Sequence, residues 1–260
     1  MTGISGTGAA GGESDWFRAF SPSPGAAVRL LCLPHAGGSA GYWFPAAKAL
    51  APGIEVLAVQ YPGRHDRRQD PLVPEVSVLA DLIADELAAY ADRPLAVLGH
   101  SMGAVVGFEV VQRLEARGRA AVELFVSGRR APSAVRGDQW HQVGEAELIA
   151  EIKSLGGAGS ELLDDPEIRA MMLPVIRNDY RAVETHVYRP GARVSCPVTV
   201  LTGDADPKVT VDEAMAWQDH TTGAFRAEVF PGGHFYLADH LDAVLATVTA
   251  ALTAPALAAD

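Results

Sequence analysis

Cysteine, long apolar runs and positive charge are all scarce in this 260-residue sequence. The two cysteines, Cys32 and Cys196, lie far apart and outside any CxxC pattern, so we expect reduced core thiols and no metal site. The formal net charge of -11 argues against nucleic acid or anionic membrane as partners, because phosphate groups need a basic face. There is neither a basic leader nor an apolar segment of membrane length, so we expect a cytoplasmic protein.

The composition is that of a folded globular protein, with 48% hydrophobic and 20% charged residues. A chain of this length can bury one large core, and we expect a single domain that carries one insertion. Residues 1–14 are rich in Gly, Ala, Ser and Thr and are expected to form a flexible tail. Residues 15–136 and 189–260 are expected to form the core, and residues 137–188 the insertion.

Short apolar runs alternate with segments of helical periodicity through most of the chain. Repeated strand–helix–strand units of this kind predict an α/β fold with a mostly parallel central sheet flanked by helices. The expected strands are 28–33, 54–60, 95–98, 122–127, 196–202 and 225–230, and the expected helices include 76–90, 104 onward and 241–252.

Residues 137–188 show helical patterns and no strand pattern. Helices are expected over 145–155, over 165–173 and, from Pro174, over 174–186. An excursion of about fifty residues is too long for an ordinary crossover in a parallel sheet, which predicts a helical lid. Five side chains could face a substrate chain under this lid, although a plainly packed helix pair explains them equally well: Met171, Met172, Val175, Ile176 and Tyr180.

Ser101 lies in the pentapeptide Gly99-His100-Ser101-Met102-Gly103, between an apolar run and a helical pattern. A serine on so sharp a turn needs small neighbours two residues to either side, and both are glycines. The helix that follows would point free amide hydrogens at a developing negative charge. We therefore predict a nucleophile elbow with Ser101 as the nucleophile. The alternative is a chance pattern in a chain that has 26 glycines.

A glycine-rich loop over residues 34–41 directly follows an expected strand. In α/β-hydrolase folds a loop in this position supplies one backbone amide of the oxyanion hole, and the residue after the serine supplies the other. These two positions are Ala36 and Met102. The alternative for this loop is a tight turn that binds no ligand.

A serine hydroxyl needs a base within hydrogen-bond distance, and that base needs an acid to orient it. His234 is the preferred base, because it alone of the eight histidines lies in the loop after the last expected strand. Asp206 is the preferred acid, because it lies farther out in the loop after the preceding strand than Asp204, which would form the turn. The less favoured alternatives are His35 and His100 for the base, and Asp204 and Asp138 for the acid.

Five segments follow one another in a distinctive order: 33–38 (LPHAGG), 61–64 (YPGR), 99–104 (GHSMGA), 127–132 (SGRRAP) and 232–236 (GGHFY). Together they resemble the type II thioesterases of polyketide and nonribosomal peptide synthesis, over roughly residues 16–250. The resemblance implies an α/β-hydrolase fold. It also implies Ser101, Asp206 and His234 as the catalytic triad, and the amides of Ala36 and Met102 as oxyanion donors.

The resemblance further implies a function, which is to hydrolyse acyl thioesters on the phosphopantetheine arm of carrier proteins and so clear stalled or wrongly primed chains. No cofactor is expected, because the substrate itself carries the phosphopantetheine, and a monomer is expected. Two other functions stay open on this fold, a general carboxylesterase or lipase acting on small acyl esters and a non-catalytic binding module. Acidic carrier proteins would need local basic contacts on this acidic chain, for which the candidates are Arg64, Arg67, Arg68, Arg129 and Arg130.

Overall fold

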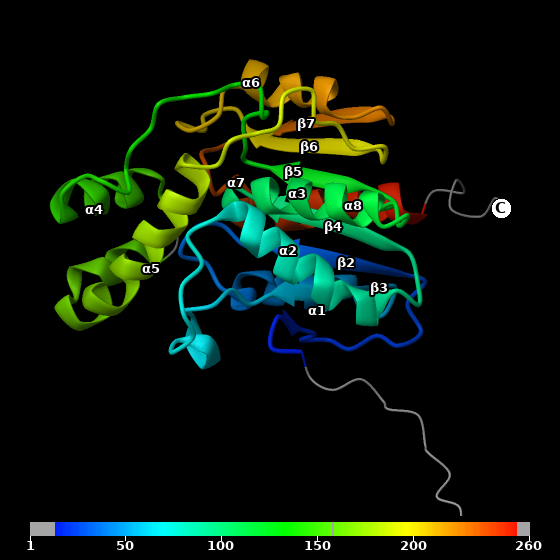
Figure 1. Ribbon diagram of the computed structural model, residues 1–260, viewed down its shortest axis with the longest axis horizontal. Coiled ribbons are helices and arrows are strands. Elements are labelled where there is room, and N and C mark those ends of the chain that lie inside the picture. The colour runs from blue at the N-terminus through cyan, green and yellow to red at the C-terminus, as the bar shows by residue number, and fades with distance from the viewer. Residues whose placement is uncertain (1–13, 158, 254–260) are drawn as a thin grey trace, which may run out of the picture.

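The computed structural model describes residues 14–157 and 159–253. Its centre is a seven-stranded sheet in the order β1-β3-β2-β4-β5-β6-β7 (Figure 1). All neighbouring strands are parallel except β1, which pairs antiparallel with β3, so the expected mostly parallel sheet is confirmed. The strands are β1 (Phe17–Arg18), β2 (Val28–Leu33), β3 (Ile54–Val59), β4 (Leu95–His100), β5 (Leu124–Ser127), β6 (Val198–Gly203) and β7 (Phe225–Phe230).

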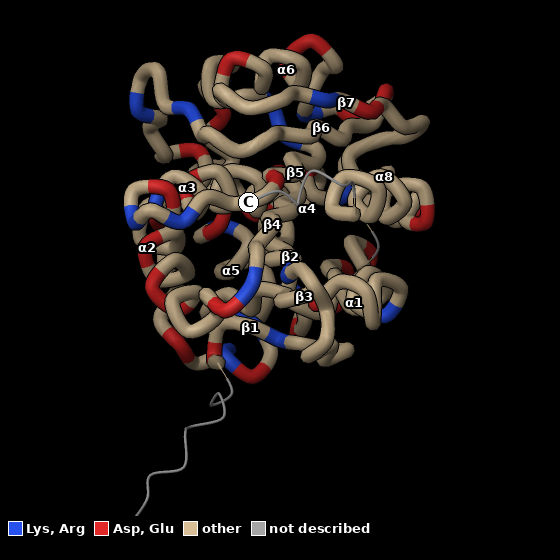
Figure 2. Tube along the Cα trace, turned by 90° about the vertical axis from the view of Figure 1, so that its right-hand side faces the viewer, with Lys and Arg blue, Asp and Glu red and all other residues tan. Residues whose placement is uncertain are grey.

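Helices cover both faces of the sheet and form a three-layered body (Figure 2). Helices α2 (Val76–Glu86) and α3 (Met102–Ala116) pack on one face, and α1 (Phe44–Leu50) and α8 (Leu241–Thr253) pack on the other. Strands β2 to β6 are therefore buried at every position, which explains their near-continuous apolar sequences. Strand β7 lies at the edge of the sheet and keeps several exposed residues.

Between β5 and β6 the chain leaves the sheet and forms α4 (Glu145–Ser154), a 3-10 turn (Ser160–Asp164) and α5 (Pro166–Glu184). We call residues 137–188 the helical segment. Figure 1 places α4 and α5 together at one end of the sheet. The segment has a small apolar core of its own, which consists of Leu148, Leu163, Leu173 and Ile176.

The helix boundary expected at Pro174 is wrong, because α5 continues through this residue. Proline removes one hydrogen bond from a helix interior and favours a kink. Pro174 lies on the exposed side of α5, whereas Leu173 and Ile176 are buried in the core of the helical segment. Packing of the apolar face therefore outweighs the local cost of the proline.

The remaining differences from expectation concern short elements. Trp16 and Phe17 are buried, as expected for aromatic residues that hold the start of the chain on the body, and they also place the unexpected strand β1 beside β3. Most of the expected tail, residues 1–13, lies outside the described residues. In the part of the chain that the structure describes, no helix is long and apolar enough to cross a membrane. The short helices are α6 (Val211–Met215), α7 (Tyr236–Asp239) and 3-10 turns at Ala40–Trp43, His65–Arg67, Leu87–Tyr90 and Ala216–His220.

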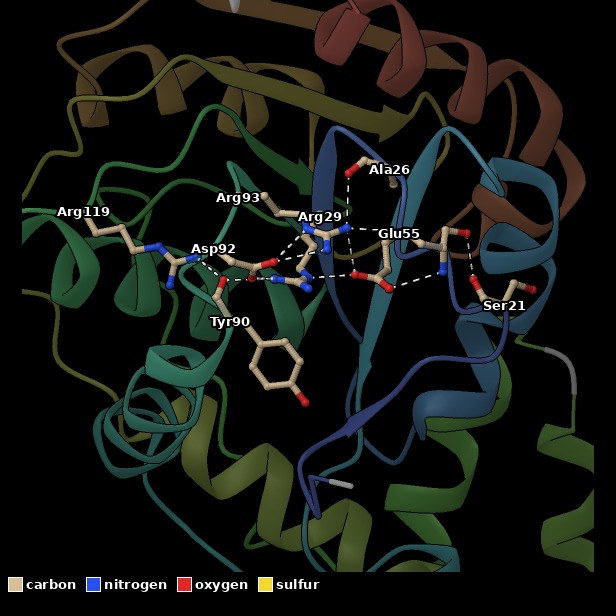
Figure 3. A network of polar contacts seen from close by, with 9 residues as sticks. Ser21, Ala26, Arg29, Glu55, Tyr90, Asp92, Arg93 and Arg119 are labelled. Carbon is tan, nitrogen blue, oxygen red and sulfur yellow. Dashed lines mark hydrogen bonds and ion pairs between the residues drawn. The ribbon is translucent and has the colours of Figure 1, made fainter. Parts of the chain in front are cut away.

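An ion-pair network joins the amino-terminal ends of β2 and β3 (Figure 3). Arg29 Nε donates to Glu55 Oε2 at 2.7 Å, and Arg29 also pairs with Asp92. Arg93 donates to the Ala26 carbonyl at 3.1 Å. Arg29 and Glu55 are both buried, and removing one partner of a buried pair costs on the order of 3–5 kcal/mol. Loss of one partner would therefore destabilise the end of the sheet that lies opposite the loops after the strands.

Candidate active site

Ser101 directly follows β4 and precedes α3, at the carboxyl-terminal edge of the sheet. Its backbone angles are φ 55° and ψ −112°, a strained conformation for a residue with a Cβ. The Ser101 amide donates to the Ser127 carbonyl at 2.8 Å, which holds the turn. A Cβ at Gly99 would lie 2.1 Å from the Gly103 carbonyl oxygen, and one at Gly103 would lie 2.1 Å from the Leu33 carbonyl oxygen. Only glycine fits these two positions, as a nucleophile elbow requires.

His234 and Asp206 are buried and directly paired. His234 Nδ1 lies 2.8 Å from Asp206 Oδ2, and Asp206 Oδ1 accepts the Lys208 amide at 2.8 Å. A carboxylate at Nδ1 holds the ring proton there, which leaves Nε2 free to accept a proton. His234 and Ser101 line the same cleft. The structure thus gathers the three predicted triad residues from the loops after β4, β6 and β7.

The two alternative acids have other partners in the described structure. Asp204 Oδ1 accepts the Gly232 amide at 2.9 Å, which ties the loop after β6 to the loop after β7. Asp138 pairs with Arg130 at 2.9 Å. The geometry therefore favours Asp206 as the acid that orients His234.

The two alternative bases pack close to His234 as neutral rings. Burial, together with the nearby His234 charge, lowers the pKa of His35 from 6.5 to about 3. Burial also lowers the pKa of His100 well below its ordinary value. His100 Nδ1 lies 2.9 Å from Ser127 Oγ, and the centroids of the His100 and His234 rings are 5.2 Å apart. These contacts make His100 a buried supporting ring that packs against His234.

Ala36 and Met102, the predicted oxyanion donors, also line the cleft. Met102 begins α3, and the first amides of a helix have no acceptor within the helix. The loop that holds Ala36 forms a tight turn, because the Gly38 amide donates to the His35 carbonyl at 2.9 Å. The two amides come from the loops after β2 and β4, which are adjacent strands. This adjacency places both loops at the same edge of the sheet, where the prediction needs them.

A second cavity of about 490 Å³ adjoins the cleft, and we call it the apolar chamber. The cleft and the chamber share lining residues, among them Tyr180 and Phe235, so they lie side by side. Loops after β2 and β3 form one side of the chamber and the helical segment forms the other. Its lining includes all five side chains predicted from the sequence: Met171, Met172, Val175, Ile176 and Tyr180.

A family model described as the thioesterase domain matches residues 28–252, which is most of the chain. The chain belongs to the thioesterase family. It is 48% identical over 237 residues to the probable cadicidin biosynthesis thioesterase of Streptomyces griseus, a match that covers 91% of this chain and 66% of that protein. It is 46% identical over 226 residues to thioesterase PikA5 of Streptomyces venezuelae, covering 86% of this chain and 80% of that protein.

Solved structures agree with this assignment. The type II thioesterase BorB from the borrelidin biosynthetic cluster matches with a TM-score of 0.86 and 46% identity, covering 93% of this chain and 100% of that one. The predicted α/β-hydrolase fold and the resemblance to type II thioesterases are therefore confirmed. This chain is accordingly an enzyme of the thioester hydrolase type.

Two of the five arginines predicted to contact a carrier protein are instead used inside the thioesterase. Arg64 is buried and pairs with Asp179 of α5. Arg130 is buried and pairs with Asp138 at 2.9 Å. The prediction is wrong for these two, because a buried and paired guanidinium is not available to the surface of a partner.

The other three arginines differ in the pairing and the exposure of their side chains. Arg67 Nε lies 2.8 Å from Asp70 Oδ2, and its guanidinium stacks 4.3 Å from the centroid of the Trp16 ring. Arg68 is exposed at the rim of the apolar chamber. Arg129 is half-buried and lines the cleft. Arg68 and Arg129 thus remain as candidate contacts.

Two residues beside the site were missed in the sequence. The Lys208 amide donates to Asp206, and its ammonium pairs with Glu151 of α4, so it connects the acid to the helical segment. Burial lowers the pKa of the Lys208 ammonium to about 8, and neighbouring arginines contribute. Asp179 lies on the buried face of α5, at a three-residue spacing from apolar positions. A charge on an apolar helix face is the signal by which Asp179 could have been found.

Proposed function

We propose that this thioesterase removes acyl groups from the phosphopantetheine thioester of carrier proteins, as an editing step in polyketide or nonribosomal peptide synthesis. One observation carries the proposal: His234, whose Nδ1 lies 2.8 Å from Asp206 Oδ2, lines a cleft together with Ser101, and this cleft adjoins an apolar chamber. The relatives named as biosynthetic thioesterases support the class of pathway.

The reaction begins at Ser101. Its hydroxyl oxygen attacks the thioester carbonyl while His234 Nε2 takes the hydroxyl proton, and Asp206 stabilises the imidazolium that forms. The amides of Ala36 and Met102 donate to the oxyanion of the tetrahedral intermediate. These residues supply the nucleophile, the base and the oxyanion donors, so this mechanism has no step that needs a cofactor.

The second half of the reaction releases the acyl group. His234 returns its proton to the sulfur of the leaving pantetheine thiol, and an acyl ester on Ser101 remains. Water then attacks this ester with His234 again as the base, which frees the carboxylic acid and the serine. Proton transfer runs through the same imidazole in both halves, so loss of His234 stops both.

The two cavities suggest how the substrate is held. The apolar chamber would take the acyl chain, because its lining is mainly apolar and it adjoins the cleft that Ser101 lines. The helical segment, residues 137–188, would act as the lid over this space. The pantetheine arm would enter through the rest of the cleft, with Arg129 in its lining and Arg68 at the rim of the chamber toward the carrier protein. The monomeric state and the cytoplasmic location remain predictions.

Two variants and two substrates test the proposal. We expect Ser101→Ala and His234→Ala to fold normally but to lose nearly all turnover, because each removes a group on which the whole cycle depends. Turnover of acyl-carrier thioesters is then compared with that of matched oxygen esters in the wild-type enzyme. Preference for the carrier-bound thioester supports editing, whereas preference for the oxygen ester assigns the chain to the carboxylesterases. Hydrolysis that persists in Ser101→Ala overturns the scheme.

A further inference from the structure

Helix α5 of the helical segment contacts the loop that carries Ala36. The carboxylate of Asp179 on α5 accepts the Gly37 amide at 2.7 Å, through Oδ2. The same oxygen pairs with the Arg64 guanidinium. Asp179 and Arg64 are both buried, so solvent does not compete for these bonds. One carboxylate oxygen thus joins α5, the loop after β2 and the loop after β3.

Arg64 holds the same loop from a second side. Its Nε donates to the Gly38 carbonyl at 3.3 Å, and its Nη1 donates to the Pro62 carbonyl at 2.6 Å. Gly37 is therefore bonded through its amide, and Gly38 is bonded through its carbonyl. Two hydrogen bonds on consecutive residues leave little freedom for the peptide that precedes them.

Apolar packing reinforces these bonds. Gly37 has φ +76°, and a Cβ at this position would lie 2.7 Å from Ile176 Cγ1. Ile176 precedes Asp179 by three residues, so the two side chains share one face of α5. The same face of α5 thus supplies both the apolar contact and the carboxylate to the loop. This loop conformation depends on where α5 lies.

The charges of the pair matter for an oxyanion nearby. A lone carboxylate beside the Gly37 amide would repel the negative charge that develops next to Ala36. The Arg64 guanidinium offsets the charge of Asp179 at the same oxygen. Burial raises the pKa of the Asp179 carboxyl, and Arg64 opposes that rise. The pair therefore gives the loop a firm acceptor without adding net negative charge.

We propose that Asp179 and Arg64 are positioning residues for the oxyanion hole, through which α5 holds the Ala36 amide in place for the reaction. This inference rests on the proposed role of Ala36 as an oxyanion donor. It makes the helical segment part of the catalytic geometry as well as a wall of the apolar chamber. Asp179 lines neither the cleft nor the chamber, and both side chains act on the reaction through the loop.

Three variants test the inference on a short acyl thioester of N-acetylcysteamine, which needs no carrier protein. Asp179→Ala removes both bonds, Asp179→Asn keeps an oxygen that can accept the Gly37 amide, and Asp179→Leu with Arg64→Met replaces the pair by two apolar groups that can make neither bond. Arg177→Gln is the control, because Arg177 lies on α5 and donates to the His141 and Val143 carbonyls within the helical segment.

We expect Asp179→Ala to lower kcat roughly tenfold to a hundredfold with KM changed less than about twofold, because the displaced Ala36 amide donates to the substrate oxygen mainly in the transition state. The inhibition constant of an alkyl boronic acid, which mimics the tetrahedral intermediate, should rise by the same factor as kcat falls. Asp179→Asn should recover part of both losses. Arg177→Gln should leave both quantities near those of the wild type.

The double variant decides the outcome if Asp179→Ala does not fold. A folded double variant with wild-type kcat and wild-type boronic acid inhibition overturns the inference. So does an equal loss of kcat in Arg177→Gln and Asp179→Asn at matched thermal stability, because that result indicates a general structural effect. The proposed function fails separately, when Ser101→Ala still hydrolyses the thioester, whereas the inference fails when Ser101→Ala is inactive and the Asp179 variants are not impaired.

Discussion

Ser101 is held in a backbone conformation, φ 55° and ψ −112°, that costs on the order of 1–3 kcal/mol for a residue with a Cβ. The hydrogen bond from its amide to the Ser127 carbonyl at 2.8 Å compensates for part of this cost. The close passage of Gly99 and Gly103 leaves the chain no room to relax. The surrounding residues thus keep the strain in the folded state, and the serine projects from the turn without further rearrangement.

Asp206 and Asp204 make the sharpest comparison at the residue scale. We expect Asp206→Asn to lower kcat by roughly 10³-fold or more, because an amide no longer holds the His234 proton on Nδ1. Asp204→Asn is the matched control, since its carbonyl oxygen can still accept the Gly232 amide, and its kcat should stay within about threefold of the wild type. Steady-state hydrolysis of a short acyl thioester measures both. Equal losses of kcat in the two variants would show that Asp206 is not the acid that orients His234.

His100 makes stability depend on pH. Burial lowers its pKa in the folded state, so only the unfolded chain binds a proton at this ring just below about pH 6.5. The stabilisation gained by keeping this ring neutral is therefore complete above that pH. As the pH falls below it, the free energy of unfolding decreases by up to about 1.4 kcal/mol per pH unit. We expect His100→Asn, whose amide can still meet Ser127 Oγ, to lessen the loss of stability as the pH falls below about 6.5. Urea unfolding at several pH values measures the effect, and parallel curves for the two proteins would refute it.

At the scale of elements, the apolar chamber depends on α5. Met172 is partly buried and lines the chamber, and we expect Met172→Trp to lower kcat/KM for a decanoyl thioester about tenfold more than for an acetyl thioester, because the larger ring occupies space for the chain. Met215 lies on α6, is 37% exposed and lines neither the cleft nor the chamber, so Met215→Trp is the matched control and should change kcat/KM for the two substrates alike. A series of acyl chain lengths gives the measurement. An equal loss of turnover for the acetyl and decanoyl thioesters would show that the chamber does not bind the acyl chain.

The central strands were predictable to within a few residues, and the helical segment was predictable in kind. Strands β2, β3 and β4 are buried on both faces, so their apolar runs identify them without further information. Strand β1 has two residues and exists only because β3 lies beside it. Pro174 misled the prediction because a local rule about helix breaking says nothing of the packing that keeps α5 intact.

At the scale of the whole molecule, the net charge of -11 is unfavourable for binding an acidic carrier protein. Attraction of the carrier protein must then depend on local positive charge, and Arg68 is exposed at the rim of the apolar chamber. We expect Arg68→Glu to raise KM for carrier-bound substrate severalfold and to leave KM for a small acyl thioester unchanged, with the difference shrinking in added salt.

Arg193→Glu provides the control for charge alone. Arg193 is exposed and precedes β6, so it lies toward the end of the sheet away from the site. KM for carrier-bound substrate, measured for both variants at two salt concentrations, separates local from overall charge effects. An equal rise in the two variants would show that net charge alone acts and that Arg68 has no contact with the carrier.

The sequence by itself determined the order of strands and helices, the glycines of the elbow, and the loops on which Ser101, Asp206 and His234 lie. These features depend on local patterns, and a parallel sheet brings the ends of its strands to one edge whatever else varies. Only the tertiary structure decided which acid meets His234, and that Arg64 faces Asp179 across 115 positions of the chain rather than a partner protein. Such pairings depend on how distant segments pack, because the place of Asp179 on an apolar helix face indicates a buried charge but not the residue that pairs with it.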